Sequence, residues 1–150
     1  MLSTDLITYD RSAREYLVAH PETGDVLDRF PAGQKAAAFR YLVSLFAPEL
    51  YQAAERVISR HPQLERVTWK GVEILTSGGV EVLTPPVNNC LAMVASSDGA
   101  GRYAITTENG FISCQCQHFQ SFAAPMTDSG RMICKHIMAY QLAMYTETRF

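Results

Sequence analysis

The sequence has no excess of basic residues and no long apolar segment. Thirteen Lys and Arg residues oppose fifteen Asp and Glu residues, which gives a net charge of −2, unlike a strongly basic nucleic-acid-binding domain. No apolar run approaches the roughly 20 residues that a membrane-spanning helix needs. Residues 1–6 lack the basic and apolar regions of a secretory signal. We therefore expect a cytoplasmic protein without a membrane partner, in a reducing environment that keeps thiols available for metal.

Common catalytic motifs are also missing from the sequence. The chain contains no glycine-rich phosphate loop, no His-Glu-x-x-His and no Gly-x-Ser-x-Gly. It has no internal repeat and no low-complexity tract. These absences argue against an enzyme and against a small-molecule substrate, and they favour a binding or structural role.

The sequence does contain a group of potential metal ligands near its C-terminal end. Cys114 and Cys116 form a Cys-x-Cys pair, and Cys134 and His136 form a Cys-x-His pair. Three thiolates and one imidazole make a complete tetrahedral ligand set for Zn²⁺, whereas a catalytic zinc keeps one position for water. The pattern therefore predicts one structural zinc ion.

The local structure expected around these residues would bring the two pairs together. In an extended segment Cys114 and Cys116 point to the same face. Cys134 and His136 directly precede residues 137–145, which have helical periodicity. We expect the ring nitrogen of the histidine that does not bind metal to be held by a carbonyl or a carboxylate.

Other interpretations of the same residues remain open. Cys90 would allow two disulfides to use all four cysteines, and buried unpaired cysteines would behave as small apolar residues. His118 is an alternative ligand, although an exposed loop position suits it better. Cys90 stands beside an apolar run, which fits a packed strand residue better than a fifth ligand. The number and spacing of the ligands favour zinc over these alternatives.

The order Cys114-x-Cys116 and then Cys134-Lys135-His136, with a strand before and a helix after, resembles the SWIM-type zinc finger. The resemblance covers residues 91–145 and implies a ββα unit with one zinc ion on these four ligands. It also implies a nucleic-acid-associated role, because SWIM fingers occur in transposases, remodelling ATPases and recombination partners, where they are proposed to bind DNA or proteins. The family often has a proline and an acidic residue after the first pair, where this chain has Gln117 and His118.

The whole pattern predicts an α+β chain with two regions, 1–79 and 80–150, or one continuous compact domain. In the first region we expect a β-hairpin with strands at 15–20 and 26–30, although residues 12–15 also fit a helix-capping box. Three helices should follow, over residues 34–46, 49–60 and about 62–76. Gly71 costs about 1 kcal/mol in the third helix, so we expect another backbone close to it.

The second region should be an antiparallel meander that the SWIM-like zinc module closes. Alternation and turn residues predict four strands, over 80–84, 90–95, 102–107 and 111–114. Pro85 and Pro86 mark a boundary after the first of them, and residues 120–131 form a long loop before Cys134.

Basic residues near the last ligand pair give the only local suggestion of a nucleic-acid surface. Arg131 and Lys135 flank Cys134, and Arg56, Arg60 and Arg66 would join them if the helices pack nearby. A solvated surface also explains such residues. We expect a zinc-binding module with weak to moderate contact to DNA or RNA through Arg131 and Lys135. The alternative, favoured by the mildly acidic charge, is a protein–protein interaction adaptor with a purely structural zinc.

Overall fold

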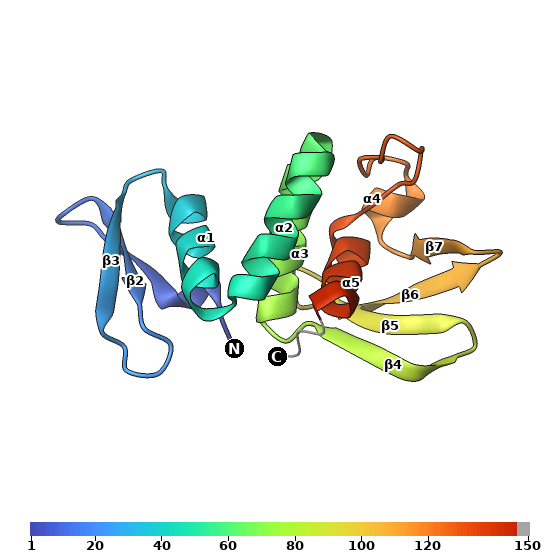
Figure 1. Ribbon diagram of the computed structural model, residues 1–150. Coiled ribbons are helices and arrows are strands. Elements are labelled where there is room, and N and C mark those ends of the chain that lie inside the picture. Colours follow the sequence, from blue (N-terminus) through green and yellow to red (C-terminus); the bar gives the residue numbers. More distant parts are fainter. Residues whose placement is uncertain (147–150) are drawn as a thin grey trace. The chain divides into compact units, whose positions relative to one another are not determined.

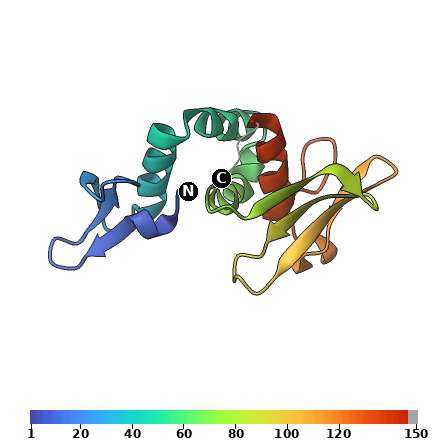
Figure 2. The same ribbon diagram turned by 90° about the horizontal axis from the view of Figure 1, so that it is seen from below.

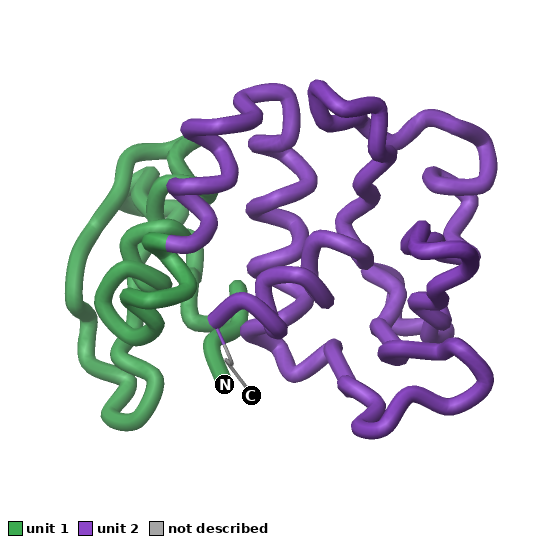
Figure 3. The backbone as a smooth tube through the Cα atoms, turned by 45° about the vertical axis from the view of Figure 1, so that its right-hand side comes forward, with its two compact units in different colours: residues 1–52 green, residues 53–150 purple. Residues whose placement is uncertain are grey.

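The computed structural model describes residues 1–146 and shows a mixed α and β chain with two antiparallel sheets. Its residues group into two compact units, 1–52 and 53–150 (Figure 3). Five α-helices lie within the described residues: α1 (Lys35–Phe46), α2 (Pro48–Arg60), α3 (Glu65–Thr76), α4 (Gln117–Gln120) and α5 (Lys135–Thr146). None of the helices formed by residues 1–146 combines the length and apolar character required to cross a bilayer.

The first unit is a three-stranded antiparallel sheet packed against α1 (Figure 1). Its strands β1 (Ile7–Asp10), β2 (Glu15–Ala19) and β3 (Val26–Pro31) pair in sequence order, with Val18 opposite Ile7 and Asp28. Val18 and, from α1, Leu42 and Val43 are fully buried. This core is made by apolar burial alone.

The predicted hairpin is present as β2 and β3, and β1 is a further strand that was not predicted. Residues 12–15 do not start a helix. Instead, the Asp10 carboxylate accepts hydrogen bonds from the backbone N–H groups of Ser12 and Ala13, which builds the tight turn between β1 and β2. An Asx-type turn and a capping box use similar residues, so the sequence alone supports either structure.

The second unit contains a four-stranded antiparallel meander. Its strands are β4 (Val80–Val87), β5 (Cys90–Ala95), β6 (Arg102–Glu108) and β7 (Phe111–Cys114), in that order. Strand β4 continues through Pro85 and Pro86, which corrects the expected boundary. Its pairing with β5 shifts between Val82 and Val87, and prolines are tolerated at such irregularities and on edge strands.

Helix α5 lies between this sheet and α3 (Figures 1 and 2). It contacts all four strands, and buried residues are found on most of its circumference. On the sheet, Ala92, Val94 and Ile105 are fully buried. A helix that is apolar on nearly all sides is typical of an element covered on both faces.

Gly71 explains how α3 approaches α5 so closely. A Cβ atom at this position would lie 3.0 Å from the Ala139 backbone nitrogen and 3.0 Å from Met138 Cγ. The expectation that a neighbouring backbone justifies this glycine is therefore confirmed. Helix α3 packs on α5 and belongs to the second compact unit. The expected division between residues 79 and 80 had placed it in the first region.

Candidate metal centre

The four predicted ligands come from three neighbouring elements of the second unit. Cys114 is the last residue of β7, and Cys116 is the N-cap of α4. Cys134 directly precedes α5, and His136 lies in the first turn of that helix. Short helix α4 was not predicted. It turns the chain immediately after the first pair, so that Cys116 stays beside Cys114.

The structure brings the four side chains together in the interior. One ligand atom from each residue can be chosen such that all four lie within 4.8 Å of one another. The exposed fractions are 1% for Cys114, 3% for Cys116, 0% for Cys134 and 2% for His136. Tetrahedral zinc with bonds of about 2.0–2.3 Å would hold its ligand atoms roughly 3.6–3.8 Å apart. The donor set therefore fits one metal ion after a small contraction.

Backbone N–H groups are directed at each of the three sulfur atoms. The Cys116 N–H donates to Cys114 Sγ at 3.4 Å, and the Phe119 N–H donates to Cys116 Sγ at 3.4 Å. The Ile137 N–H donates to Cys134 Sγ at 3.5 Å. Such hydrogen bonds, together with the positive end of α5 beside Cys134, stabilise negative charge on sulfur. The fold thus favours thiolates where metal ligands are needed.

The three thiols differ in acidity. A hydrogen bond from the Cys114 thiol lowers the pKa of Cys134 to about 4. The same hydrogen bond raises the pKa of Cys114, and burial raises the pKa of Cys116. The site therefore favours a thiolate most strongly at Cys134. A bound cation would favour the thiolate form of all three cysteines, so metal binding would release protons.

The environment of His136 differs in one respect from the prediction. Its ring packs on Tyr103 with centroids 4.8 Å apart, and Nδ1 lies 3.9 Å from Cys134 Sγ. Nε2 is buried and has no hydrogen-bond partner among the described residues, so the expected carbonyl or carboxylate is not found. A buried nitrogen without a partner costs free energy. Nδ1 is the ring nitrogen whose position beside a cluster sulfur fits metal binding.

The alternative roles of the other residues are not supported by their positions. His118 is exposed on α4 and is not part of the cluster. Cys90 is half-buried on β5, where its thiol donates to the Ala92 carbonyl oxygen at 3.4 Å. All four cysteines are free thiols, so the disulfide alternative is wrong.

The two predicted contact residues, Arg131 and Lys135, line different hollows. Lys135 Nζ donates a hydrogen bond to Ser97 Oγ at 2.6 Å. The Lys135 side chain also lines a hollow of about 440 Å³, together with Arg66, Lys70 and His118. Arg131 lies in the loop before Cys134 and lines a second hollow together with Arg56 and Arg60. Of the helix arginines expected near them, Arg66 lines the hollow of Lys135, and Arg56 and Arg60 line that of Arg131. Lys70 and His118 were missed because their proximity to Lys135 depends on how α3, α4 and α5 pack.

Comparisons of the chain with protein-family models, with curated proteins and with solved structures find no match.

Proposed function

We propose that the second unit is a binding module held together by one structural zinc ion on Cys114, Cys116, Cys134 and His136. The observation that carries this proposal is the buried cluster of three sulfurs and one imidazole within 4.8 Å. Thiolate-rich tetrahedral sites are typical of zinc. Other thiolate-binding metals remain testable by metal analysis of the purified protein.

A structural role fits the site better than catalysis. All four coordination positions would be filled by protein atoms, and all four residues are buried. A catalytic zinc needs an accessible position for water or substrate. The ion would instead fasten the end of β7 to the start of α5, across residues 115–134, whose buried apolar residues besides the cysteines are Ala124 and Ile133. We therefore propose that the protein is not an enzyme.

We further propose that the module is of the SWIM type and acts in a nucleic-acid-associated system. The support is the ligand order, its position between a strand and a helix, and the basic hollow beside the cluster. Arg66, Lys70, His118 and Lys135 line that hollow, and Lys135 stands in the chain between two ligands. Lys70 is also paired with Glu73 at 3.2 Å, so we expect a modest number of phosphate contacts.

Nucleic-acid titrations at several salt concentrations test this proposal. We expect weak binding of DNA or RNA whose affinity falls steeply with salt, since phosphate contacts release counterions. Arg66→Glu with Lys135→Glu should abolish binding and leave the zinc content unchanged. Arg11→Glu with Lys35→Glu makes the same charge change at two exposed positions of the first unit and should alter binding little. If no binding occurs even at low salt, the adaptor role, which the net charge of −2 favours, replaces the nucleic-acid role.

A further inference from the structure

A second hollow of the second unit has a different chemistry from the basic hollow at Lys135. It has a volume of about 360 Å³ and is lined by the part of α2 after residue 52, the loop before Cys134 and one face of α5. We call it the α2–α5 groove. Its volume lies at the lower end of the ~300–1,000 Å³ range of ligand sites.

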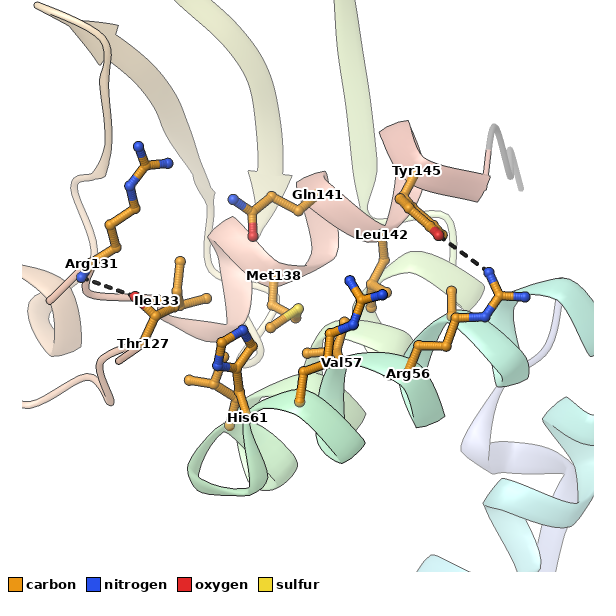
Figure 4. A pocket seen from close by; sticks show the side chains of 13 residues that line it. Arg56, Val57, His61, Thr127, Arg131, Ile133, Met138, Gln141, Leu142 and Tyr145 are labelled. Carbon is orange, nitrogen blue, oxygen red and sulfur yellow. Dashed lines mark hydrogen bonds between the residues drawn. The ribbon is translucent and has the colours of Figure 1, made fainter. Parts of the chain in front are cut away.

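The floor of the groove is aliphatic. Met138 and Leu142 from α5 point toward Val57 on α2, and Leu64 and Ile133 complete the floor (Figure 4). Leu64, Ile133, Met138 and Leu142 are buried, and Val57 is half-buried. An apolar floor that remains open to the surface favours a ligand with an apolar side chain or body.

The rim of the groove is cationic. Arg56, Arg60 and Arg131 line it, all three are exposed, and no Asp or Glu is found among the lining residues within 53–146. Arg56 Nη1 donates to Tyr145 Oη at 3.2 Å (Figure 4), and Tyr145 is 67% exposed. Exposed Arg and Tyr residues around an apolar centre are typical of protein-binding surfaces.

The loop on one side of the groove is tied to the rest of the unit. Gln63 Nε2 donates to the Met126 carbonyl oxygen at 3.1 Å and to Asp128 Oδ1 at 3.2 Å. Within the loop, the Thr127 N–H donates to the Arg131 carbonyl oxygen at 2.8 Å, and the Arg131 N–H donates to Thr127 Oγ1 at 3.1 Å. These bonds fix the backbone that carries Arg131, so the groove is largely preformed.

We propose that the α2–α5 groove binds an acidic peptide segment of a partner protein, which inserts one or two apolar side chains between flanking carboxylates. The three arginines would pair with the carboxylates, and the aliphatic floor would bury the apolar side chains. A nucleic-acid strand fits less well, because successive bases stack on several aromatic faces, and among the lining residues only His61 and Tyr145 carry an aromatic ring while the floor is aliphatic. This site is separate from the basic hollow at Lys135 and goes beyond the nucleic-acid contact proposed above.

Selection from a random-peptide display library on the zinc-loaded full chain tests the proposal. We expect enriched peptides to combine a large apolar residue with flanking Asp or Glu. The Arg56→Ala, Arg60→Ala, Arg131→Ala triple variant should bind the enriched peptide roughly tenfold more weakly and with less salt dependence. The Arg11→Ala, Arg29→Ala, Lys35→Ala triple variant, which removes the same charge from exposed positions of the first unit, is the matched control. Zinc content and thermal unfolding verify that each variant is folded.

A second variant tests the floor. Val57→Glu places a carboxylate at a half-buried floor position and should abolish peptide binding, while Lys135→Glu should leave it unchanged. The proposal is overturned if no peptide is enriched, if enriched peptides lack acidic residues, or if the triple variant binds as tightly as the original chain. It is also overturned if the triple variant loses oligonucleotide binding but keeps peptide binding, since that result assigns the groove to nucleic acid.

Discussion

The two compact units of this chain are organised around different kinds of interior. Residues 1–52 pack α1 on a three-stranded sheet and depend on apolar side chains such as Val18 and Leu42. Residues 53–146 also bury apolar residues between α3, α5 and a larger sheet, but they place three thiols and an imidazole in that interior. Buried polar groups are costly without a partner. The second unit should therefore depend on metal, and the first should not.

The largest expected difference between the units comes from removing a ligand. Cys114→Ser, Cys116→Ser, Cys134→Ser or His136→Ala should lose the metal ion and destabilise residues 111–146 by several kcal/mol. Structural zinc contributes about 10–16 kcal/mol of apparent binding free energy in small fingers. Hydrogen exchange followed by mass spectrometry should show faster exchange in the second unit and unchanged protection in residues 1–46.

Two variants provide the controls for that experiment. Cys90→Ser and His118→Ala remove similar side chains outside the cluster, so metal content and exchange should stay as in the original chain. Loss of metal in either control would contradict the ligand assignment. Equal loss of hydrogen-exchange protection in both units of a ligand variant would contradict the claim that only the second unit depends on metal.

The converse experiment weakens the first unit alone. Leu42 is fully buried, and Leu42→Ala should lower the free energy of unfolding of residues 1–52 by about 2–5 kcal/mol through the cavity it leaves. Leu45→Ala is the matched control on the same helix, because Leu45 is 48% exposed. Metal content should be unchanged in both. Metal loss in Leu42→Ala would show that the metal site depends on the first unit.

Metal affinity should fall as the pH falls, because protons compete with the ion for the thiolates. A metal-bound thiolate has a lowered pKa, so the stability it contributes is present above the unfolded-state pKa and is lost on acidification. A hydrogen bond from Cys114 lowers the pKa of Cys134, whereas the pKa values of Cys114 and Cys116 are raised, so metal loading near pH 7 should release protons. Calorimetry in buffers of different ionisation enthalpy measures this release. Metal loading without any release of protons would contradict coordination by thiolates.

The smallest expected effect concerns the contact between α3 and α5. Gly71→Val would push side-chain atoms into the Ala139 backbone, 3.0 Å from the position of a Cβ. We expect a loss of about 1–3 kcal/mol, confined to the second unit. Lys70→Val, an exposed neighbour on the same helix, should change stability by about 0.5 kcal/mol or less. Thermal unfolding of the metal-loaded protein measures the loss of stability in each variant. Equal losses in Gly71→Val and Lys70→Val would mean that the close approach of α3 to α5 contributes nothing to stability.

Local sequence patterns predicted most elements and all four members of the cluster. Strands β5 and β7 have the predicted bounds, and the helices ending at Phe46, Arg60 and Thr76 end where proline or glycine was expected to stop them. The glycine stop after Thr76 is visible in detail, since the Gly78 and Gly79 N–H groups donate to the Leu75 and Ile74 carbonyl oxygens. Such stop signals involve residues that are close together in the chain, so they can be recognised without knowledge of the fold.

The features that were missed depend on contacts between distant residues. Strand β1 is four residues long and is defined by its pairing with β2, and β4 passes through two prolines because its pairing is irregular there. The placement of Arg131 and Lys135 in different hollows depends on the path of the loop between Cys116 and Cys134. The groove floor combines residues from α2, α5 and that loop, and no periodicity in one segment predicts it.

X-ray absorption spectroscopy at the zinc edge, on the full chain purified without added metal, tests the central claim most directly. The account predicts one zinc ion per chain with three sulfur neighbours at about 2.3 Å and one nitrogen neighbour at about 2.0–2.1 Å. Absence of metal, or a first shell made of oxygen and nitrogen, would contradict it.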